Sequence, residues 1–513
     1  MRSRSILALM IAITISSSIW MGTIRVEAVV YNWTSPGEFL SCFAHLYGNE
    51  YWQSKGLNFA AVEIDNSGGV ESESRTISVA VQGYTNVALK NVSLAPREKR
   101  TVYLNPIFTA DLKMITAPIS ANATLRVLRS DGTESYRDTK TITLLPVNYL
   151  YWSKDSFLRT FSIVFSTPTA DPIRRLVSVA NKTTPFEAMS GYKEMKGFTK
   201  EEVVEGQMRA IYNTMKALGV TYVNSSLTLY ETKAQTIRIT RQMFTDYSGN
   251  ALEIALPFVS ALESVDLKPY LIFMTGHVVI GVAEWSSSDQ LLYLDTSMIK
   301  SSYEDARARG KQLVDQKKSS DPAYLVVDVY KLRKDYKVTS TPYIDLSSPT
   351  EFQQKITRLS ADIDAAKTAI SQAKTKVDSI RDKVYDKAES KAFRQKAIDE
   401  YTLAVTSFNL GQYVESKSHA EQATENVSKA ESTQASPPGT YMILIVVAAA
   451  VGLGAGFILF LRKKAKSPVR PEEALEAPAE KATAGQPQTK SCPKCSASNA
   501  PTAKFCETCG AEL

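Results

Sequence analysis

The chain has 513 residues, of which 44% are hydrophobic and 22% charged, and its formal net charge is +7 at pH 7. This composition is typical of a globular chain and leaves room for several domains of roughly 100–200 residues each. It excludes a disordered or collagen-like chain, and a small positive charge that forms no dominant basic stripe argues against nucleic acid as the main partner.

The first apolar segment follows a short basic start. Residues 6–24 carry no charge, and Val26-Glu27-Ala28 offers a small-residue cleavage site. Residues 1–28 are therefore predicted to be a signal peptide, or an uncleaved signal anchor, because the apolar run is close to the ~20 residues that span a bilayer. Either alternative exports the domains that follow.

Short alternating segments fill residues 29–147. Their period-2 pattern is interrupted by turn signals such as Asn-Ser-Gly-Gly at 66–69 and Ser-Asp-Gly at 130–132. This pattern predicts an antiparallel β-sandwich of immunoglobulin-like type. Cys42 and His45 are close in sequence, and a buried pair within the β-domain is favoured over a reactive site.

Cysteine usage agrees with export. Four of the five cysteines lie in residues 492–513 and only Cys42 lies in the exported part, so no disulfide framework forms within one exported chain. Asn-x-Ser/Thr sequons support exposure outside the cell only weakly, because such tripeptides arise by chance. They begin at Asn32, Asn91, Asn122, Asn181, Asn224 and Asn426.

Residues 148–346 alternate between helical and strand patterns, which predicts an α+β domain. Within it, Gly249-Asn250 precedes an apolar helical segment at 251–269. Gly276-His277 follows, and then Leu294-Asp295-Thr296-Ser297 at the end of a strand-like run. These elements agree in their order, in their spacing and in their flanking hydrophobic residues, so they are considered as one set of motifs.

On these motifs, the segment Gln207–Asp295 resembles the transglutaminase-like superfamily with its papain-type core, especially exported prokaryotic members, many of them archaeal. In that family a Gly-Asn-Cys-x-Asp motif opens a helix, a Gly-His follows on a strand, and an Asp lies on the next strand. The resemblance implies a thiolate favoured by the helix N-terminus and the imidazolium, with the Asp orienting the imidazole.

The position that matches the family's nucleophile is Ala251, and a methyl group cannot form an acyl-enzyme. The acidic residue of the motif is kept only as Glu253, whereas His277 and Asp295 remain. The resemblance therefore implies a pseudoenzyme in which Ala251, His277 and Asp295 are vestigial positions. The remaining pair either lines a cleft for a peptide, an amide side chain or a glycan, or is only a structural hydrogen bond.

The alternative is a surface acyl-transfer enzyme or amidase that uses Ser248 with His277 and Asp295. Ser248 lies three residues before the matching position, so an N-cap or turn serine is favoured. Shifting the register supplies no thiol, because no cysteine occurs between residues 43 and 491.

Residues 351–433 contain no tryptophan or proline and are rich in alanine, lysine and acidic residues. Apolar residues recur in alternating steps of three and four from Ile356 to Val384, which is a heptad seam. This pattern predicts a coiled-coil stalk whose first helix extends about 45 Å. Gly411 marks a turn or kink. An antiparallel hairpin is favoured over pairing with a second chain.

The uncharged segment 441–461 is followed by the basic run 462–466. It predicts a single transmembrane helix with its C-terminal end in the cytoplasm. Ala448, Gly452 and Gly456 form a small-residue stripe that would let two such helices approach closely in a homodimer.

The last segments are predicted to be cytoplasmic. Residues 462–490 are rich in Pro, Ala and Glu, which is typical of a disordered linker. Residues 491–513 resemble the short zinc ribbons that end many prokaryotic membrane proteins, with one structural zinc ion held by four thiolates. A redox pair of motifs is disfavoured because no βαβ pattern surrounds them. The predicted ligands are Cys492, Cys495, Cys506 and Cys509.

Taken in order, the segments predict an all-β sandwich, an α+β transglutaminase-like domain, an α-helical coiled-coil hairpin, one transmembrane helix and a zinc ribbon. The predicted function is non-enzymatic binding or scaffolding at the cell surface, with an extracellular peptide or glycan as ligand and a cytoplasmic protein as the partner of the ribbon. A purely structural cell-wall spacer is the third class.

Overall fold

The computed structural model describes residues 24–26, 29–69, 71–151, 159–224, 234–435, 490–491 and 498–499. The chain separates into two units, Met1–Ala435 and Ser436–Leu513. In the second unit, β18 (Lys490–Ser491) and β19 (Ser498–Asn499) form an antiparallel pair.

Several predicted segments lie outside the described residues. They are the signal segment up to residue 23, the transmembrane segment 441–461 and the four predicted zinc ligands. Within the ranges that the structure does describe, no helix is both long and apolar enough to cross a membrane.

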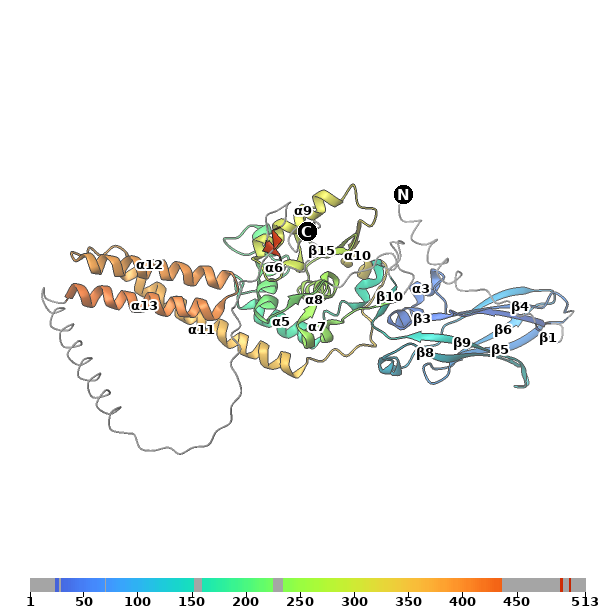
Figure 1. Ribbon diagram of the computed structural model, residues 1–513. Coiled ribbons are helices and arrows are strands. Elements are labelled where there is room, and N and C mark those ends of the chain that lie inside the picture. The colour runs from blue at the N-terminus through green and yellow to red at the C-terminus, as the bar shows by residue number, and fades with distance from the viewer. Residues whose placement is uncertain are drawn as a thin grey trace, which may run out of the picture. The chain divides into compact units, whose positions relative to one another are not determined.

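The N-terminal domain consists of two sheets (Figure 1). One has the order β1-β2-β4-β7 and the other β3-β9-β8-β5-β6, with every pair antiparallel except β3 and β9. The strands are β1 (Ile24–Val26), β2 (Val29–Thr34), β3 (Glu38–Leu40), β4 (Ala60–Asp65), β5 (Glu73–Val81), β6 (Ala88–Leu94), β7 (Lys99–Leu104), β8 (Ile119–Arg129) and β9 (Glu134–Leu145). Short helices connect them: η1 (Ser41–Phe43), α2 (Ala44–Tyr47), α3 (Glu50–Ser54) and η2 (Ala110–Met114).

Alternation along these strands places one set of side chains in the core. On β8, Ala121, Ala123, Leu125 and Val127 are buried, whereas Asn122 and Arg126, which alternate with them, are exposed. A period of two separates the two faces of a strand, so one face of this sheet packs inward and the other meets solvent.

The second domain surrounds a four-stranded antiparallel sheet of order β16-β15-β14-β17. Its strands are β14 (Pro269–Met274), β15 (His277–Ala283), β16 (Leu291–Leu294) and β17 (Leu325–Asp328). Two small sheets pair β10 (Tyr149–Tyr151) with β12 (Ala234–Thr236), and β11 (Thr221–Tyr222) with β13 (Ser248–Gly249). The helices are η3 (Phe161–Phe165), α5 (Asp171–Asn181), α6 (Lys200–Ala217), α7 (Thr240–Asp246), α8 (Ala251–Ser264), η4 (Thr296–Met298), α9 (Tyr303–Lys317) and α10 (Val329–Lys334).

Helix α8 is the centre of this domain. Every residue from Ala251 to Leu262 is buried, because the helix is apolar on all sides and solvent contact would be unfavourable around its whole circumference. The strands beside it are continuous apolar runs because both of their faces are covered. Leu271 and Val278 belong to the same core as α8, whereas Ile272 and Val279 pack with Val314 of α9 on the other side.

A polar network ties the C-terminal end of α8 to its surroundings. The Arg333 guanidinium pairs with the Glu263 carboxylate at 2.9 Å, and both side chains are largely buried. Arg333 also donates hydrogen bonds to the carbonyl oxygens of Val338, Ile163 and Ser166 at 2.9–3.0 Å. One side chain thus satisfies three backbone carbonyl groups from two segments, η3 with its C-cap residue and the segment after α10.

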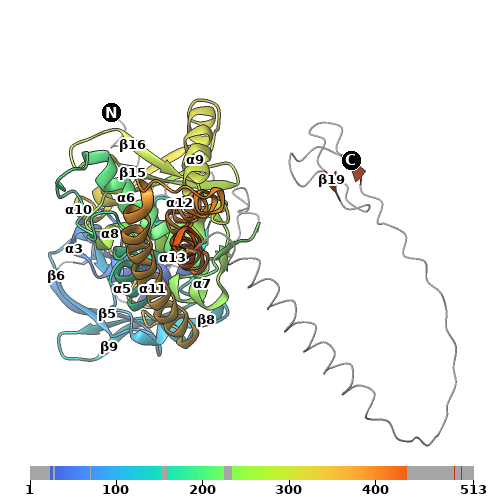
Figure 2. The ribbon, with the colours of Figure 1, turned by 90° about the vertical axis from the view of Figure 1, so that its left-hand side faces the viewer.

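Three helices follow the second domain: α11 (Thr350–Arg381), α12 (Ala388–Asn409) and α13 (Tyr413–Ala435) (Figure 2). The first half of α11 belongs to the core of the second domain through Phe352, Ile356 and Ile363. Its second half packs with α12 and α13 in a separate core, for which Val377 and Ile380 supply the larger side chains.

The helical seam differs from the prediction at its end. Val384 is 88% exposed because α11 ends at Arg381, so the predicted seam stops one step early. Gly411 forms the turn between α12 and α13 with φ of +77°. Lys383 pairs with Glu431 at 2.7 Å, which places the end of α13 beside the end of α11.

Breaking the Arg333–Glu263 pair is expected to destabilise the second domain. Arg333→Met leaves a largely buried carboxylate without its cation and removes the donors to three carbonyl oxygens, which should lower the free energy of unfolding by about 3 kcal/mol. Urea denaturation followed by tryptophan fluorescence measures the change, and hydrogen exchange in α8 locates it. Lys374→Met, which breaks the exposed Lys374–Asp378 pair, is the matched control and should leave the transition unchanged. Equal shifts for the two variants would contradict the assignment.

Candidate functional site

The N-terminus of α8 is closed by its own side chains. Asn250 is the N-cap residue, and its side-chain oxygen accepts from the backbone N–H groups of Leu252 and Glu253 at 3.0 Å. The Glu253 carboxylate accepts from the Asn250 N–H at 2.9 Å, which completes a capping box. This carboxylate is buried and also accepts from the backbone N–H of Arg238 at 2.9 Å and from its guanidinium at 3.0 Å.

His277 and Asp295 lie on neighbouring strands. His277 is the first residue of β15, and Asp295 follows the last residue of β16, to which β15 is paired. His277 Nε2 lies 3.0 Å from Asp295 Oδ1. The Asp295 side chain is 2% exposed and that of His277 is 19% exposed. The imidazole is therefore the solvent-facing member of this pair.

Ala251 is linked to the residue that follows Asp295. The Thr296 hydroxyl donates to the Ala251 carbonyl oxygen at 3.4 Å. Of the three positions predicted to be vestigial, the structure therefore pairs His277 with Asp295 and connects Ala251 to the next residue, Thr296, while Ala251 is buried and supplies only a methyl group. Ser248 is half-buried in β13, and within the described part of the chain no hydrogen bond joins its hydroxyl to His277.

The carboxyl group of Asp295 is ionised in this environment. Burial alone would raise its pKa, but the hydrogen bond and charge of His277 and the hydrogen bonds of Ser297 outweigh burial and lower the pKa below its ordinary value. The backbone N–H of Ser297 donates to Asp295 Oδ1 at 3.0 Å. A buried carboxylate with these partners orients the imidazole through Nε2 and leaves Nδ1 as its other polar atom.

Two tyrosines near Asp295 were not identified from the sequence. Burial, and then the charge of Asp295, raise the pKa of Tyr212 and of Tyr222 above the ordinary value. Tyr222 lies on β11 opposite Gly249, just before the start of α8. A tyrosine in a two-residue strand carries no sequence signal that distinguishes it from the other 23 tyrosines of the chain.

A polar pocket of about 640 Å³ adjoins the capping box on α8. Side-chain amides, hydroxyls and one cluster of charges line it: Asn148, Gln235, Thr236, Arg238, Gln242, Asp246, Asn250 and Glu253. Arg238 pairs with Asp246 at 3.1 Å and with Glu253 at 3.0 Å, so two carboxylates surround one cation. The pocket therefore disfavours anions and suits an uncharged polar ligand.

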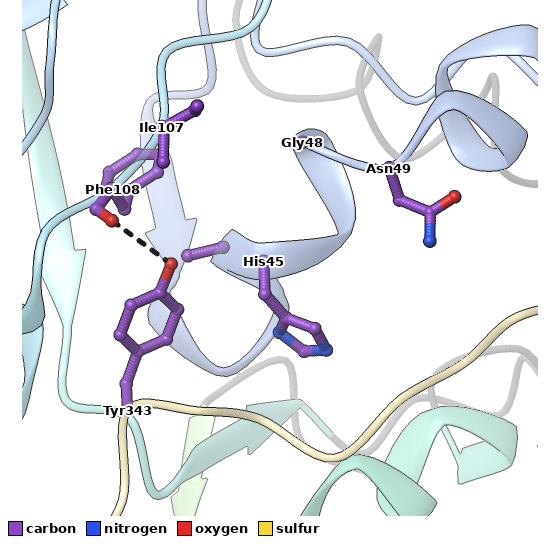
Figure 3. Close-up of a pocket in the computed structure, with 7 residues that line it drawn as sticks. His45, Gly48, Asn49, Ile107, Phe108 and Tyr343 are labelled. Atoms are coloured by element: carbon purple, nitrogen blue, oxygen red, sulfur yellow. Dashed lines mark hydrogen bonds between the residues drawn. The ribbon is translucent and has the colours of Figure 1, made fainter.

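A smaller pocket of about 340 Å³ lies where the first domain meets the segment after α10 (Figure 3). Phe108 and Tyr343 form its apolar side, and the Tyr343 hydroxyl donates to the Phe108 carbonyl oxygen at 3.4 Å. His45 projects from α2 with Nε2 at 3.1 Å from the Thr339 carbonyl oxygen. Neither this pocket nor the polar pocket is lined by His277 or Asp295.

The side chains of Cys42 and His45 form hydrogen bonds with different residues, Tyr149 and Thr339. The Cys42 thiol is fully buried and donates to the Tyr149 carbonyl oxygen at 3.4 Å. Burial raises the pKa of this thiol far above its ordinary value, so the sulfur is protonated and unreactive. Across the described ranges, no group of three His, Cys, Asp or Glu side chains could hold a metal ion, and the four predicted zinc ligands lie outside those ranges.

Comparison of the chain with models of known families, with curated proteins and with solved structures gives no match. The transglutaminase-like assignment therefore depends on the motifs and on the geometry of this chain.

His45 is expected to make stability depend on pH. Burial lowers its pKa from 6.5 to about 4, and the nearby Arg333 charge also opposes protonation. Between pH 6.5 and 4 the unfolded chain binds a proton that the folded chain does not, so stability is complete above pH 6.5 and falls by up to about 3 kcal/mol as the pH approaches 4. Urea denaturation at a series of pH values measures this slope. His45→Gln should remove it, and an unchanged slope in that variant would assign the effect to other groups.

Proposed function

We propose that this chain is a membrane-anchored cell-surface protein whose transglutaminase-like domain binds or scaffolds without catalysis. The observation that carries the proposal is an intact His277–Asp295 pair, together with a methyl group instead of a nucleophile at Ala251, whose carbonyl oxygen accepts from Thr296 next to Asp295. An orienting carboxylate and an imidazole are both present, but the atom that would attack a carbonyl carbon is missing.

The geometry disfavours the alternative enzyme. A serine nucleophile needs a base within hydrogen-bond reach, and Ser248 is in a strand whose backbone pairs with Thr221. Ser248 also lies three residues before Ala251, the first residue of α8, and so is not at the position that matches the family's nucleophile. The polar pocket beside Asn250 and Glu253 is instead the surface that we assign to an uncharged peptide amide or a glycan.

The helical bundle supports a spacer role ahead of the membrane. Helix α13 ends at Ala435, and the predicted membrane segment begins six residues later. Lys387 Nζ donates to the Thr433 carbonyl oxygen at 2.7 Å, so the last turn of α13 is held at the end where α12 begins. This is the end of the bundle away from the core that the first half of α11 shares with the second domain.

Restoring the nucleophile tests the proposal. Wild-type protein in detergent should release no ammonia from a glutamine peptide above the uncatalysed rate, whereas Ala251→Cys should gain turnover. Thiolate absorbance at 240 nm, taken as a difference from wild type, should titrate in Ala251→Cys below the ordinary thiol pKa of about 8.5. Adding His277→Ala should raise that pKa because the imidazole no longer stabilises the thiolate.

Wild-type turnover that disappears in His277→Ala would overturn the pseudoenzyme proposal in favour of the serine enzyme. An ordinary thiol titration in Ala251→Cys, unaffected by His277→Ala, would show that Ala251 is not the nucleophile position. Calorimetric titration of wild type with the same peptide and with soluble envelope oligosaccharides tests for recognition. Binding should release heat, and Thr236→Arg should abolish that heat. A purely structural spacer would release no heat with either ligand.

We further propose one structural zinc ion on Cys492, Cys495, Cys506 and Cys509. Ser491 pairs with Ser498, and Cys492 and Cys495 lie between these two residues in the sequence. That arrangement supports a four-cysteine site, in which zinc supplies the folding energy that so short a unit lacks.

Zinc analysis of the full-length protein is expected to find one ion per chain, and Cys506→Ser should lower this content and increase hydrogen exchange over residues 490–513. Ser491→Ala is the control and should keep the metal. A metal-free protein whose intact mass shows two disulfides would favour the redox alternative.

A further inference from the structure

Two of the six sequons lie on the same exposed face of one sheet. Strands β6 and β8 both pair with the central strand β5, and Thr76 of β5 lies opposite Asn91 of β6. Asn91 and Asn122 are exposed, as is Ser93. Because side chains two residues apart on a strand share a face, each asparagine and its hydroxyl residue at position +2 point the same way.

The hydrogen bonds of this face leave the asparagine nitrogen available. The Thr76 hydroxyl donates to the Asn91 side-chain oxygen at 2.8 Å, so the bond engages the oxygen and not the amide nitrogen. The hydroxyl residues of the two sequons bond only to other surface hydroxyls, Ser93 to Ser74 and Thr124 to Thr139, both at 3.2 Å. Such bonds exchange readily with water and do not hold the sequons inside a packed contact.

Asn91 also lies on a strand that needs protection. β6 is the last strand of its sheet, and Val87 and Leu89 beside it are 58% and 67% exposed. An exposed edge strand with apolar side chains is a template for pairing with another chain. Leu89 and Asn91 share a face, so a bulky hydrophilic group on Asn91 would cover this edge.

Helical sequons are placed differently. Asn181 is half-buried at the end of α5, where the next residue, Lys182, pairs with Asp364 of α11 at 2.5 Å. Asn426 is half-buried on α13 within the helical bundle. A large group at either position would be directed into a helix contact.

We propose that Asn91 and Asn122 carry N-linked glycans, whereas Asn181 and Asn426 do not. The inference rests on the extracellular placement in the proposed function. The donor class is a lipid-linked oligosaccharide. The amide nitrogen forms a bond to the anomeric carbon of the sugar, the bond from that carbon to the phosphate oxygen breaks, the lipid phosphate leaves, and the nitrogen loses one proton.

Site-resolved mass spectrometry of the full-length protein, isolated from the membranes of the cell that makes it, tests the proposal. Glycopeptides are expected at Asn91 and Asn122, and bare peptides at Asn181 and Asn426. Ser93→Ala should remove the glycan at Asn91 while keeping the asparagine, and the matched Ser93→Thr should retain it. Asn91→Gln should increase aggregation on heating more than Asn122→Gln, because only Asn91 borders the apolar edge.

Bare Asn91 and Asn122, or glycans at Asn181 or Asn426, would overturn the proposal. Protease treatment of intact cells, performed in parallel, distinguishes the two possible failures. Cleavage of the N-terminal domains from outside with both asparagines bare would refute the glycans alone. Protection of those domains would refute the extracellular placement as well.

Discussion

The candidate site depends on one constraint: the backbone N–H groups at the buried N-terminus of α8 must find hydrogen-bond partners. A helix that is apolar on every side must be inside the domain, so its unpaired N–H groups cannot be hydrated and must find partners within the protein. Asn250 and Glu253 supply those partners, and Arg238 neutralises the carboxylate that does so. The Gly-Asn-x-x-Glu pattern therefore has a structural reason to persist whether or not a nucleophile follows Asn250.

The same reasoning applies to the His277–Asp295 pair. Asp295 is buried and ionised, and a buried carboxylate deprived of its partner is strongly destabilising. His277 and the backbone N–H of Ser297 pair with the Asp295 carboxylate and thereby stabilise the fold. Asp295 in turn orients the His277 imidazole. Ala251 is under no such structural requirement, because a methyl group in place of a thiol leaves no buried polar atom without a hydrogen-bond partner. These unequal costs agree with the proposal that this site keeps its histidine and carboxylate and lacks only a nucleophile.

Much of this arrangement could be predicted from the sequence, and there is a physical reason why the remainder could not be. The Gly-Asn and Gly-His motifs located the start of α8 and of β15, and period-2 runs located β5 to β9, because both signals are local. The end of the seam at Val384 was wrong, because a helix stops where its cap and its tertiary contacts decide and not where its apolar spacing ends. Tyr222 and the polar pocket beside Asn250 were missed because distant segments form them.

Helix α11 links the candidate site to the bundle through contacts that no local sequence pattern predicts. Its first turns pack Phe352 against Phe244, with ring centroids 4.6 Å apart and ring planes tilted by 45°, and place the Lys355 ammonium 3.5 Å from the centre of the Tyr247 ring. Tyr247 has φ of +48°, a conformation unfavourable for a bulky residue, and it is the last residue before β13 and the start of α8. The contact from α11 helps to maintain that conformation. Since the same helix continues into the bundle core, the bundle and the start of α8 are parts of one packed structure, and the proposed spacer is joined firmly to the second domain.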